Sequence, residues 1–153
     1  MTTGKRSLQE SPRDFKHLVI HVLVNTGCLV FSNVGDREAI DLLVGVPKSG
    51  ELRTAGIRIK TSSYNKKEKR WFFSEKKAKY FVKKPHFFYV FCLEKRGRFK
   101  PIFIVISYAD LKKMSSTVKN GNYAINIYEK QVKEGEWKNY VEDFEQIKLQ
   151  LEK

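Results

Sequence analysis

The feature that most constrains this chain is an aspartate, Asp41, inside the otherwise apolar run of residues 39–46. A short, nearly continuous apolar run is typical of a central strand that is covered on both faces of its sheet. An ionised carboxylate in such a strand costs free energy unless it meets a cation, a metal ion or a hydrogen-bond donor. Asp41 is therefore predicted to have a specific partner, and it is the first candidate functional residue.

A second strand is predicted to follow and to pair with the first. Apolar and basic residues alternate through residues 56–61, so Arg58 and Lys60 share one face of this strand. Pro-Lys-Ser-Gly at residues 47–50 has the composition of a turn. The resulting hairpin is expected to bring Asp41 close to Arg58 and Lys60 at one edge of the central sheet.

This cluster has two interpretations. An aspartate beside a strand lysine is a recurring way to hold a metal ion next to a phosphodiester. In the alternative, Asp41 is a structural carboxylate that pairs with Arg58 or Lys60. The cluster alone leaves both open.

The order of the motifs resembles a nuclease family. A Gly-Asp-x-x-x-Ile-Asp-Leu segment at residues 35–42 is followed by the hairpin and by Lys-Thr-Ser at residues 60–62. Together with residues 70–77, 87–91 and 101–107, this order is similar to the PD-(D/E)XK superfamily, which has the restriction-endonuclease-like fold. The resemblance implies an α/β (α+β) fold with a mixed central sheet flanked by helices.

The resemblance also implies a site. Asp41 would hold Mg²⁺, the backbone carbonyl of Ile59 would be a further ligand, and Lys60 would orient water or stabilise developing negative charge. The missing carboxylate would come from just before the apolar strand, where the candidates are Glu38 and Asp36, or from the first helix, where they are Glu10 and Asp14. The implied partner is nucleic acid, with DNA favoured over RNA.

Arg58 departs from the family pattern, which has Glu, Asp or Gln two residues before the lysine. A guanidinium cannot ligate a metal ion, and its charge disfavours one nearby. In one interpretation, Arg58 pairs with Asp41 and fills the metal site, which leaves a catalytically inactive module that binds nucleic acid. In the other, Arg58 contacts a phosphate while Glu38 completes the site.

The charge of the chain favours a polyanionic partner. Lys and Arg number 30 against 17 Asp and Glu, which gives a formal net charge of +13. The candidate nucleic-acid-binding residues are Lys66, Lys67, Lys69, Arg70, Lys76, Lys77 and Lys79. Trp71, beside them, is expected in the core rather than stacked on bases, while Tyr64 and Tyr80 are left open as stacking residues.

The cysteines and the start of the chain favour a cytoplasmic protein. Cys28 and Cys92 lie in apolar surroundings without metal-ligand spacing, which indicates reduced core thiols. No apolar run has the length of a membrane span, and the first residues lack the apolar segment of a secretory signal. No membrane partner is expected, and a homodimer is left open.

The predicted organisation is a flexible N-terminus at residues 1–11 and a single domain at residues 12–153. Helices are predicted at 12–25, 74–82, 107–114 and 138–151, and strands at 28–32, 39–46, 52–61, 71–73, 87–93, 102–106 and 123–128. The last of these strands is expected at a sheet edge. Three functions compete: a Mg²⁺-dependent DNA endonuclease in repair, restriction or mobile-element biology, a non-catalytic nucleic-acid-binding module, and a protein-interaction domain.

Overall fold

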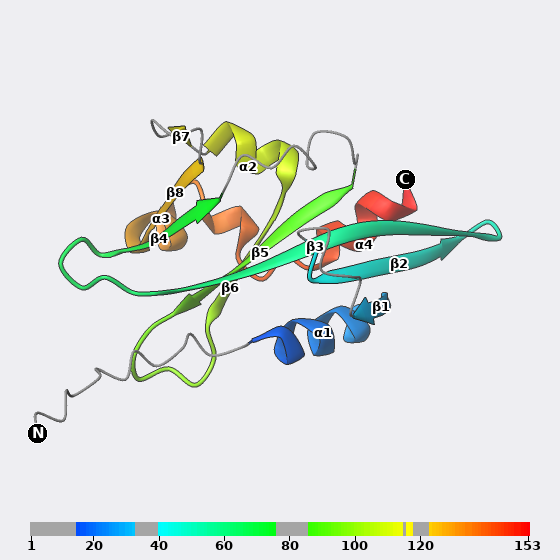
Figure 1. The fold of residues 1–153 in the computed structure, drawn as a ribbon, viewed down its shortest axis with the longest axis horizontal. Helices are drawn as coiled ribbons and strands as arrows, with labels where there is room; N and C mark the ends of the chain where they lie inside the picture. The colour runs from blue at the N-terminus through cyan, green and yellow to red at the C-terminus, as the bar shows by residue number, and fades with distance from the viewer. Residues whose placement is uncertain (1–14, 33–39, 76–85, 115, 118–122) are drawn as a thin grey trace, which may run out of the picture.

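The computed structural model describes residues 15–32, 40–75, 86–114, 116–117 and 123–153 (Figure 1). Its elements are α1 (Lys16–Asn25), β1 (Leu29–Ser32), β2 (Leu42–Lys48), β3 (Glu51–Ser63), β4 (Arg70–Glu75), β5 (Phe87–Glu94), β6 (Ile102–Ser107), α2 (Tyr108–Met114), β7 (Ser116–Thr117), β8 (Tyr123–Tyr128), α3 (Glu129–Glu134), η2 (Lys138–Tyr140) and α4 (Glu145–Glu152). The N-terminal segment predicted to be flexible lies outside the described residues.

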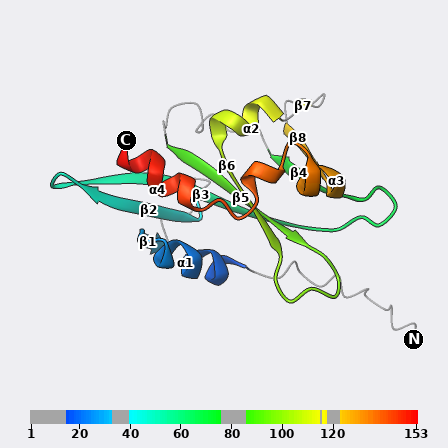
Figure 2. The same ribbon diagram turned by 180° about the vertical axis from the view of Figure 1, so that it is seen from behind.

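Two sheets form the framework. The larger has five strands in the order β1-β2-β3-β5-β6, and the smaller has three in the order β4-β8-β7. The β3-β5 pair is parallel and the other pairs are antiparallel. Both views show β4, β8, α2 and α3 gathered at one end of the molecule and β1, β2, α1 and α4 at the other (Figure 2). The predicted mixed sheet flanked by helices is confirmed.

Strand β5 separates two hydrophobic cores. Its residues Phe88, Val90 and Cys92 pack with α1 and α4 on one face, while Tyr89 and Phe91 pack with β4, β8 and α2 on the other. Because both faces are covered, the strand is apolar at almost every position instead of alternating. Strand β3, which carries the candidate site, is its immediate neighbour.

Helix α1 forms as its apolar stripe predicts. Val19 and Leu23 are buried, and the helix ends before Gly27, whose φ of 91° suits the left-handed residue that follows many helices. Cys28 and Cys92 are buried and form no disulfide, which confirms the prediction of core thiols. In the part of the chain that the structure describes, no helix has the length and apolar character to cross a membrane.

Two predictions around β4 and β8 are wrong. A helix was expected to begin at Ser74, but β4 continues through Glu75 because Ser74 and Glu75 pair with Ala124 and Tyr123 of β8. Strand β8 was expected at an edge, but it lies between β4 and β7. The rest of the predicted helix at residues 74–82 lies outside the described residues.

The single helix predicted for residues 138–151 is also wrong. The chain forms a 3₁₀ turn, then breaks, and resumes as α4. At the break, Val141 bridges Ile104 of β6, and the Glu142 N–H donates to the Phe103 carbonyl at 2.8 Å. Glu142 has a φ of 56°, which no helix interior accepts. Pairing with the edge of β6 therefore overrides the helical pattern.

Candidate active site

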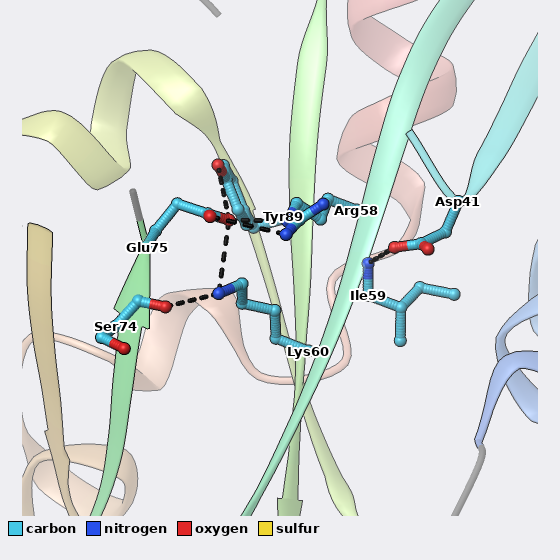
Figure 3. A network of polar contacts seen from close by, with 7 residues as sticks. All are labelled: Asp41, Arg58, Ile59, Lys60, Ser74, Glu75 and Tyr89. Carbon is cyan, nitrogen blue, oxygen red and sulfur yellow. Dashed lines mark hydrogen bonds and ion pairs between the residues drawn. The ribbon is translucent and has the colours of Figure 1, made fainter. Parts of the chain in front are cut away.

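The site lies where β2 begins against the middle of β3. The first residue of β2, Leu42, stands opposite Ile57. One residue earlier, the Asp41 N–H donates to the Ile57 carbonyl at 2.8 Å, and the Asp41 Oδ2 accepts the Ile59 N–H at 2.7 Å (Figure 3). The aspartate side chain thus takes the place of a strand partner. The sequence predicted that this carboxylate has a specific partner, and that partner is the backbone N–H of Ile59.

This bond fixes the direction of a second oxygen. In an antiparallel ladder, the N–H and C=O of one residue face the same neighbouring strand. Because the Ile59 N–H faces Asp41, the Ile59 carbonyl faces the same side of β3. Asp41 and the Ile59 carbonyl, two of the predicted metal ligands, therefore lie on the same side of β3. The third, Glu38, lies outside the described residues, as do the other three candidates for the missing carboxylate.

Arg58 and Lys60 both reach a carboxylate that the sequence did not single out, Glu75 of β4. The Glu75 Oε2 lies 2.6 Å from the Arg58 Nε and 3.4 Å from the Lys60 Nζ. The Tyr89 hydroxyl donates to the same oxygen at 3.4 Å. Glu75 is 7% exposed, and it is the one buried polar or charged residue of the described chain. Figure 3 shows this cluster on the other side of β3 from Asp41.

The prediction that Asp41 clusters with Arg58 and Lys60 and pairs with one of them is therefore wrong, because both cations reach Glu75 on the other side of β3. The guanidinium turns to Glu75, because β4 extends far enough to place a carboxylate over this face of β3. Glu75 was missed because Ser74 resembles a helix N-cap. The alternation of Trp71, Phe73 and Glu75 on the inner face of β4 is the signal that could have revealed it.

The charges of this cluster influence one another. Burial lowers the pKa of Lys60, and the carboxylates of Glu75 and Asp41 oppose that shift. Burial also raises the pKa of Tyr89, and the adjacent Glu75 raises it further, so the hydroxyl keeps its proton and donates it to Glu75. The Lys60 amine donates in addition to the Ser74 carbonyl. Lys60 is thus a partly desolvated amine anchored on β4, within electrostatic reach of Asp41.

The donor set at Asp41 suits Mg²⁺ better than a metal that needs many side-chain ligands. Mg²⁺ is usually held by one or two carboxylates, with water and substrate phosphate completing its shell. Asp41 and the Ile59 carbonyl provide such a minimal set, while Glu75 is already engaged by two cations. Within the described ranges, His, Cys, Asp and Glu side chains form no group of three or more that could hold a metal ion.

The structure describes four of the seven predicted nucleic-acid-binding residues. Lys66, Lys67 and Lys69 are exposed in the turn between β3 and β4, where the Asn65 side chain accepts the N–H groups of residues 67 and 68. Arg70 pairs with Glu68 at the start of β4. Lys76, Lys77 and Lys79 lie outside the described residues.

The aromatic residues near this turn are engaged within the protein. Trp71 is 1% exposed and its indole N–H donates to the Glu94 carbonyl at 2.9 Å, so the predicted core role is confirmed. The Tyr64 ring packs 4.9 Å from that of Trp71, and its hydroxyl bonds to Glu129. Tyr80 lies outside the described residues.

Comparison with solved structures agrees with this architecture. A bacterial homing endonuclease, I-Ssp6803I, superposes with a TM-score of 0.60 at 19% identity, over 88% of this chain and 87% of that one. The fold is restriction-endonuclease-like. The same search returns Hjc, a Holliday junction resolvase from the archaeal hyperthermophile Archaeoglobus fulgidus, with a TM-score of 0.42 at 11% identity, over 72% of this chain and 86% of that one.

At sequence level, no family model and no curated protein matches the chain. The structural likeness at this low identity establishes the fold, as the motif order predicted. What the site does has to follow from the residues that this chain carries.

Proposed function

We propose that this protein binds DNA and cleaves a phosphodiester with Mg²⁺ held by Asp41 and the Ile59 carbonyl. The observation that carries the proposal is the hydrogen bond from the Ile59 N–H to the Asp41 carboxylate. It sets two hard oxygen ligands on one side of β3, and the next residue along the strand is Lys60. This combination of ligand oxygens and a nearby cation is what metal-assisted phosphodiester cleavage requires.

Each residue has a distinct role in this proposal. A bound Mg²⁺ would polarise the phosphate and make a water molecule more acidic. Asp41 binds the ion and is itself oriented by the Ile59 amide. Lys60 stabilises negative charge on the phosphate, and its reduced proton affinity also suits an exchange of protons with water. Glu75 positions Lys60.

Arg58 is compatible with this role because its charge is balanced. The sequence suggested that a guanidinium at this position opposes a metal ion, but Glu75 lies against it. Arg58 is 27% exposed, so part of its side chain remains open to a phosphate. In this proposal, the arginine and its glutamate replace the second acidic residue of the family pattern, and Arg58 contacts the DNA backbone. Glu38 remains the candidate for a further ligand.

A second candidate function is a nuclease-fold module that binds nucleic acid without cleaving it. It is favoured by the engagement of Lys60, whose amine already contacts Ser74 and Glu75. In both functions the exposed lysines of the β3–β4 turn contact phosphates. A cytoplasmic location and a homodimer stay predictions.

Asp41→Asn separates the two functions. Asn keeps an oxygen that can accept the Ile59 N–H, but it removes the charge that binds Mg²⁺. If the protein is a nuclease, Mg²⁺-dependent nicking of supercoiled plasmid should fall by at least about 100-fold in Asp41→Asn and also in Lys60→Ala. Calorimetric Mg²⁺ binding should be lost only in the first.

Asp143→Asn is the matched control, because Asp143 is another partly exposed aspartate that accepts a side-chain amide. It should retain nicking and Mg²⁺ binding. DNA binding with neither Mg²⁺ uptake nor nicking would establish the non-catalytic module. A protein that neither binds nor cleaves DNA would overturn both functions.

A further inference from the structure

The outward face of the smaller sheet carries two exposed aromatic side chains. Phe72 of β4 is 48% exposed and Tyr128 at the end of β8 is 41% exposed. The neighbouring Trp71 and Phe73 point the other way and are buried in the core between the sheets. The core therefore accounts for the alternate residues of β4 but gives no reason for an aromatic residue on the outside.

Strand register places these aromatic residues in one patch. Residues directly opposite in an antiparallel pair share a face, and Arg70 stands opposite Tyr128 while Phe72 stands opposite Asn126. The Arg70 guanidinium lies 5.5 Å from the centre of the Phe72 ring and also donates to the Asn126 side chain. We call these four residues the aromatic face.

Lysines flank the aromatic face at both ends of the pair of strands. Lys66, Lys67 and Lys69 immediately precede β4, and Lys130 and Lys133 follow Tyr128 in α3. A groove lined by Lys69, Tyr128, Lys130 and Lys133, together with Glu68, Glu129 and Glu134, lies between the two groups of lysines.

Two of the three glutamates that line this groove pair with basic side chains. Glu68 pairs with Arg70, and Glu129 pairs with Lys95 and Lys133. The exposed lysines of the turn thus keep a positive surface beside the aromatic rings. This charge favours a polyanion over an acidic or neutral protein surface as the occupant.

We propose that the aromatic face binds single-stranded DNA, with bases stacked on Phe72 and Tyr128 and phosphates on the flanking lysines. Exposed aromatic rings flanked by basic side chains are the usual platform for unpaired strands. A duplex does not offer base faces to such rings, because its bases are stacked on one another. The inference rests on the proposed function and deepens it, since the DNA would be one that carries an unpaired stretch.

The test compares two strands of equal length and charge, an oligothymidylate and an abasic strand, by fluorescence anisotropy without Mg²⁺. Stacking contributes about 1–3 kcal/mol per base, so the thymidine strand should bind at least about 10-fold more tightly than the abasic strand. The double variant Phe72→Ala, Tyr128→Ala should bind both strands equally. Phe72→Trp should keep the preference for thymidine.

Phe99→Ala is the matched control, because Phe99 is 96% exposed in the loop between β5 and β6. It should leave the preference unchanged. Since the substituted aromatic residues are exposed, all variants should unfold within a few degrees of the natural protein.

The outcomes separate this inference from the proposed function. Equal binding of both strands by the natural protein would overturn the aromatic face while leaving electrostatic DNA binding intact. A preference for thymidine that survives the double variant would also overturn it. Failure to bind either strand, or a duplex, would overturn the proposed function as well.

Discussion

At the scale of single residues, Glu75 decides how the basic face of β3 is organised. A buried carboxylate is costly unless it is paired, and here Arg58, Lys60 and Tyr89 surround it. The dependence is mutual, because both cations are partly withdrawn from water. Removing the carboxylate takes away the negative charge that lies between two partly buried cations.

Glu75→Gln should therefore destabilise the protein. The substitution keeps the shape of the side chain but removes the negative charge that Arg58 and Lys60 both contact, so the free energy of unfolding should fall by about 2–3 kcal/mol. Glu68→Gln removes a carboxylate that pairs with Arg70 at the surface, where solvent weakens the ion pair. The free energy of unfolding should therefore fall by only about 0–1 kcal/mol. Urea denaturation of the two variants measures the difference. Equal, small effects would show that Glu75 is not needed to hold the two cations.

At the scale of elements, Glu129, the first residue of α3, holds this helix to the turn between β3 and β4. Its carboxylate accepts the Tyr64 hydroxyl and the amine of Lys95, which itself lies over the Tyr64 ring at 4.5 Å. These bonds, first that from Tyr64, lower the pKa of Glu129 to about 2. The turn that carries the exposed lysines is thereby held against the helix that follows the aromatic face.

This contact predicts a pH dependence of stability. Because the folded-state pKa of Glu129 lies below the ordinary value of 4.5, its contribution is present above about pH 4.5 and is lost as the pH falls towards about 2. Between these limits the natural protein should lose more stability than Glu129→Gln, as measured by denaturation at a series of pH values.

Tyr64→Phe keeps the ring against Trp71 but removes the hydroxyl donor, so it should raise the pKa of Glu129. The pH at which stability begins to fall should then stay the same, because the unfolded-state pKa of Glu129 sets it. The total loss of stability at low pH should become smaller, because the folded-state pKa lies closer to the unfolded one. Parallel curves for the natural protein and Glu129→Gln would contradict a stabilising role for this contact.

At the scale of the whole molecule, the net charge of +13 governs the encounter with DNA. If about six phosphates are contacted, affinity for DNA should fall roughly 10³-fold between about 50 and 200 mM salt. Replacing Lys66, Lys67 and Lys69 by Gln should reduce the slope of log affinity against log salt by about 3, whatever the DNA sequence.

A charge-matched variant controls for net charge. Lys100, Lys138 and Lys153 are exposed lysines outside the β3–β4 turn, and replacing all three by Gln removes the same formal charge. This variant should change the slope less than the turn variant does. Equal changes would mean that binding follows overall charge and has no preferred surface.

The sequence by itself determined the pieces whose cause is local. The apolar run around Asp41, the alternation in β3 and the turn between them predicted the hairpin, and the apolar run at residues 87–93 predicted strand β5. Motif order added the fold class. It also placed Asp41 beside Ile59 of the neighbouring strand, because strands joined by a short turn lie side by side whatever the rest of the chain does.

Only the tertiary structure decided the features that depend on distant partners. Glu75 reaches Arg58 because β4 pairs with β8, which lies far along the chain, and the C-terminal helix breaks because Val141 and Glu142 bond to β6. In both places hydrogen bonds from a strand distant in sequence outweigh the local helical preference. A local sequence pattern predicts the conformation that a segment's own side chains favour. The counter-charge of Arg58 comes from the other sheet, so it depends on the packing of the two sheets.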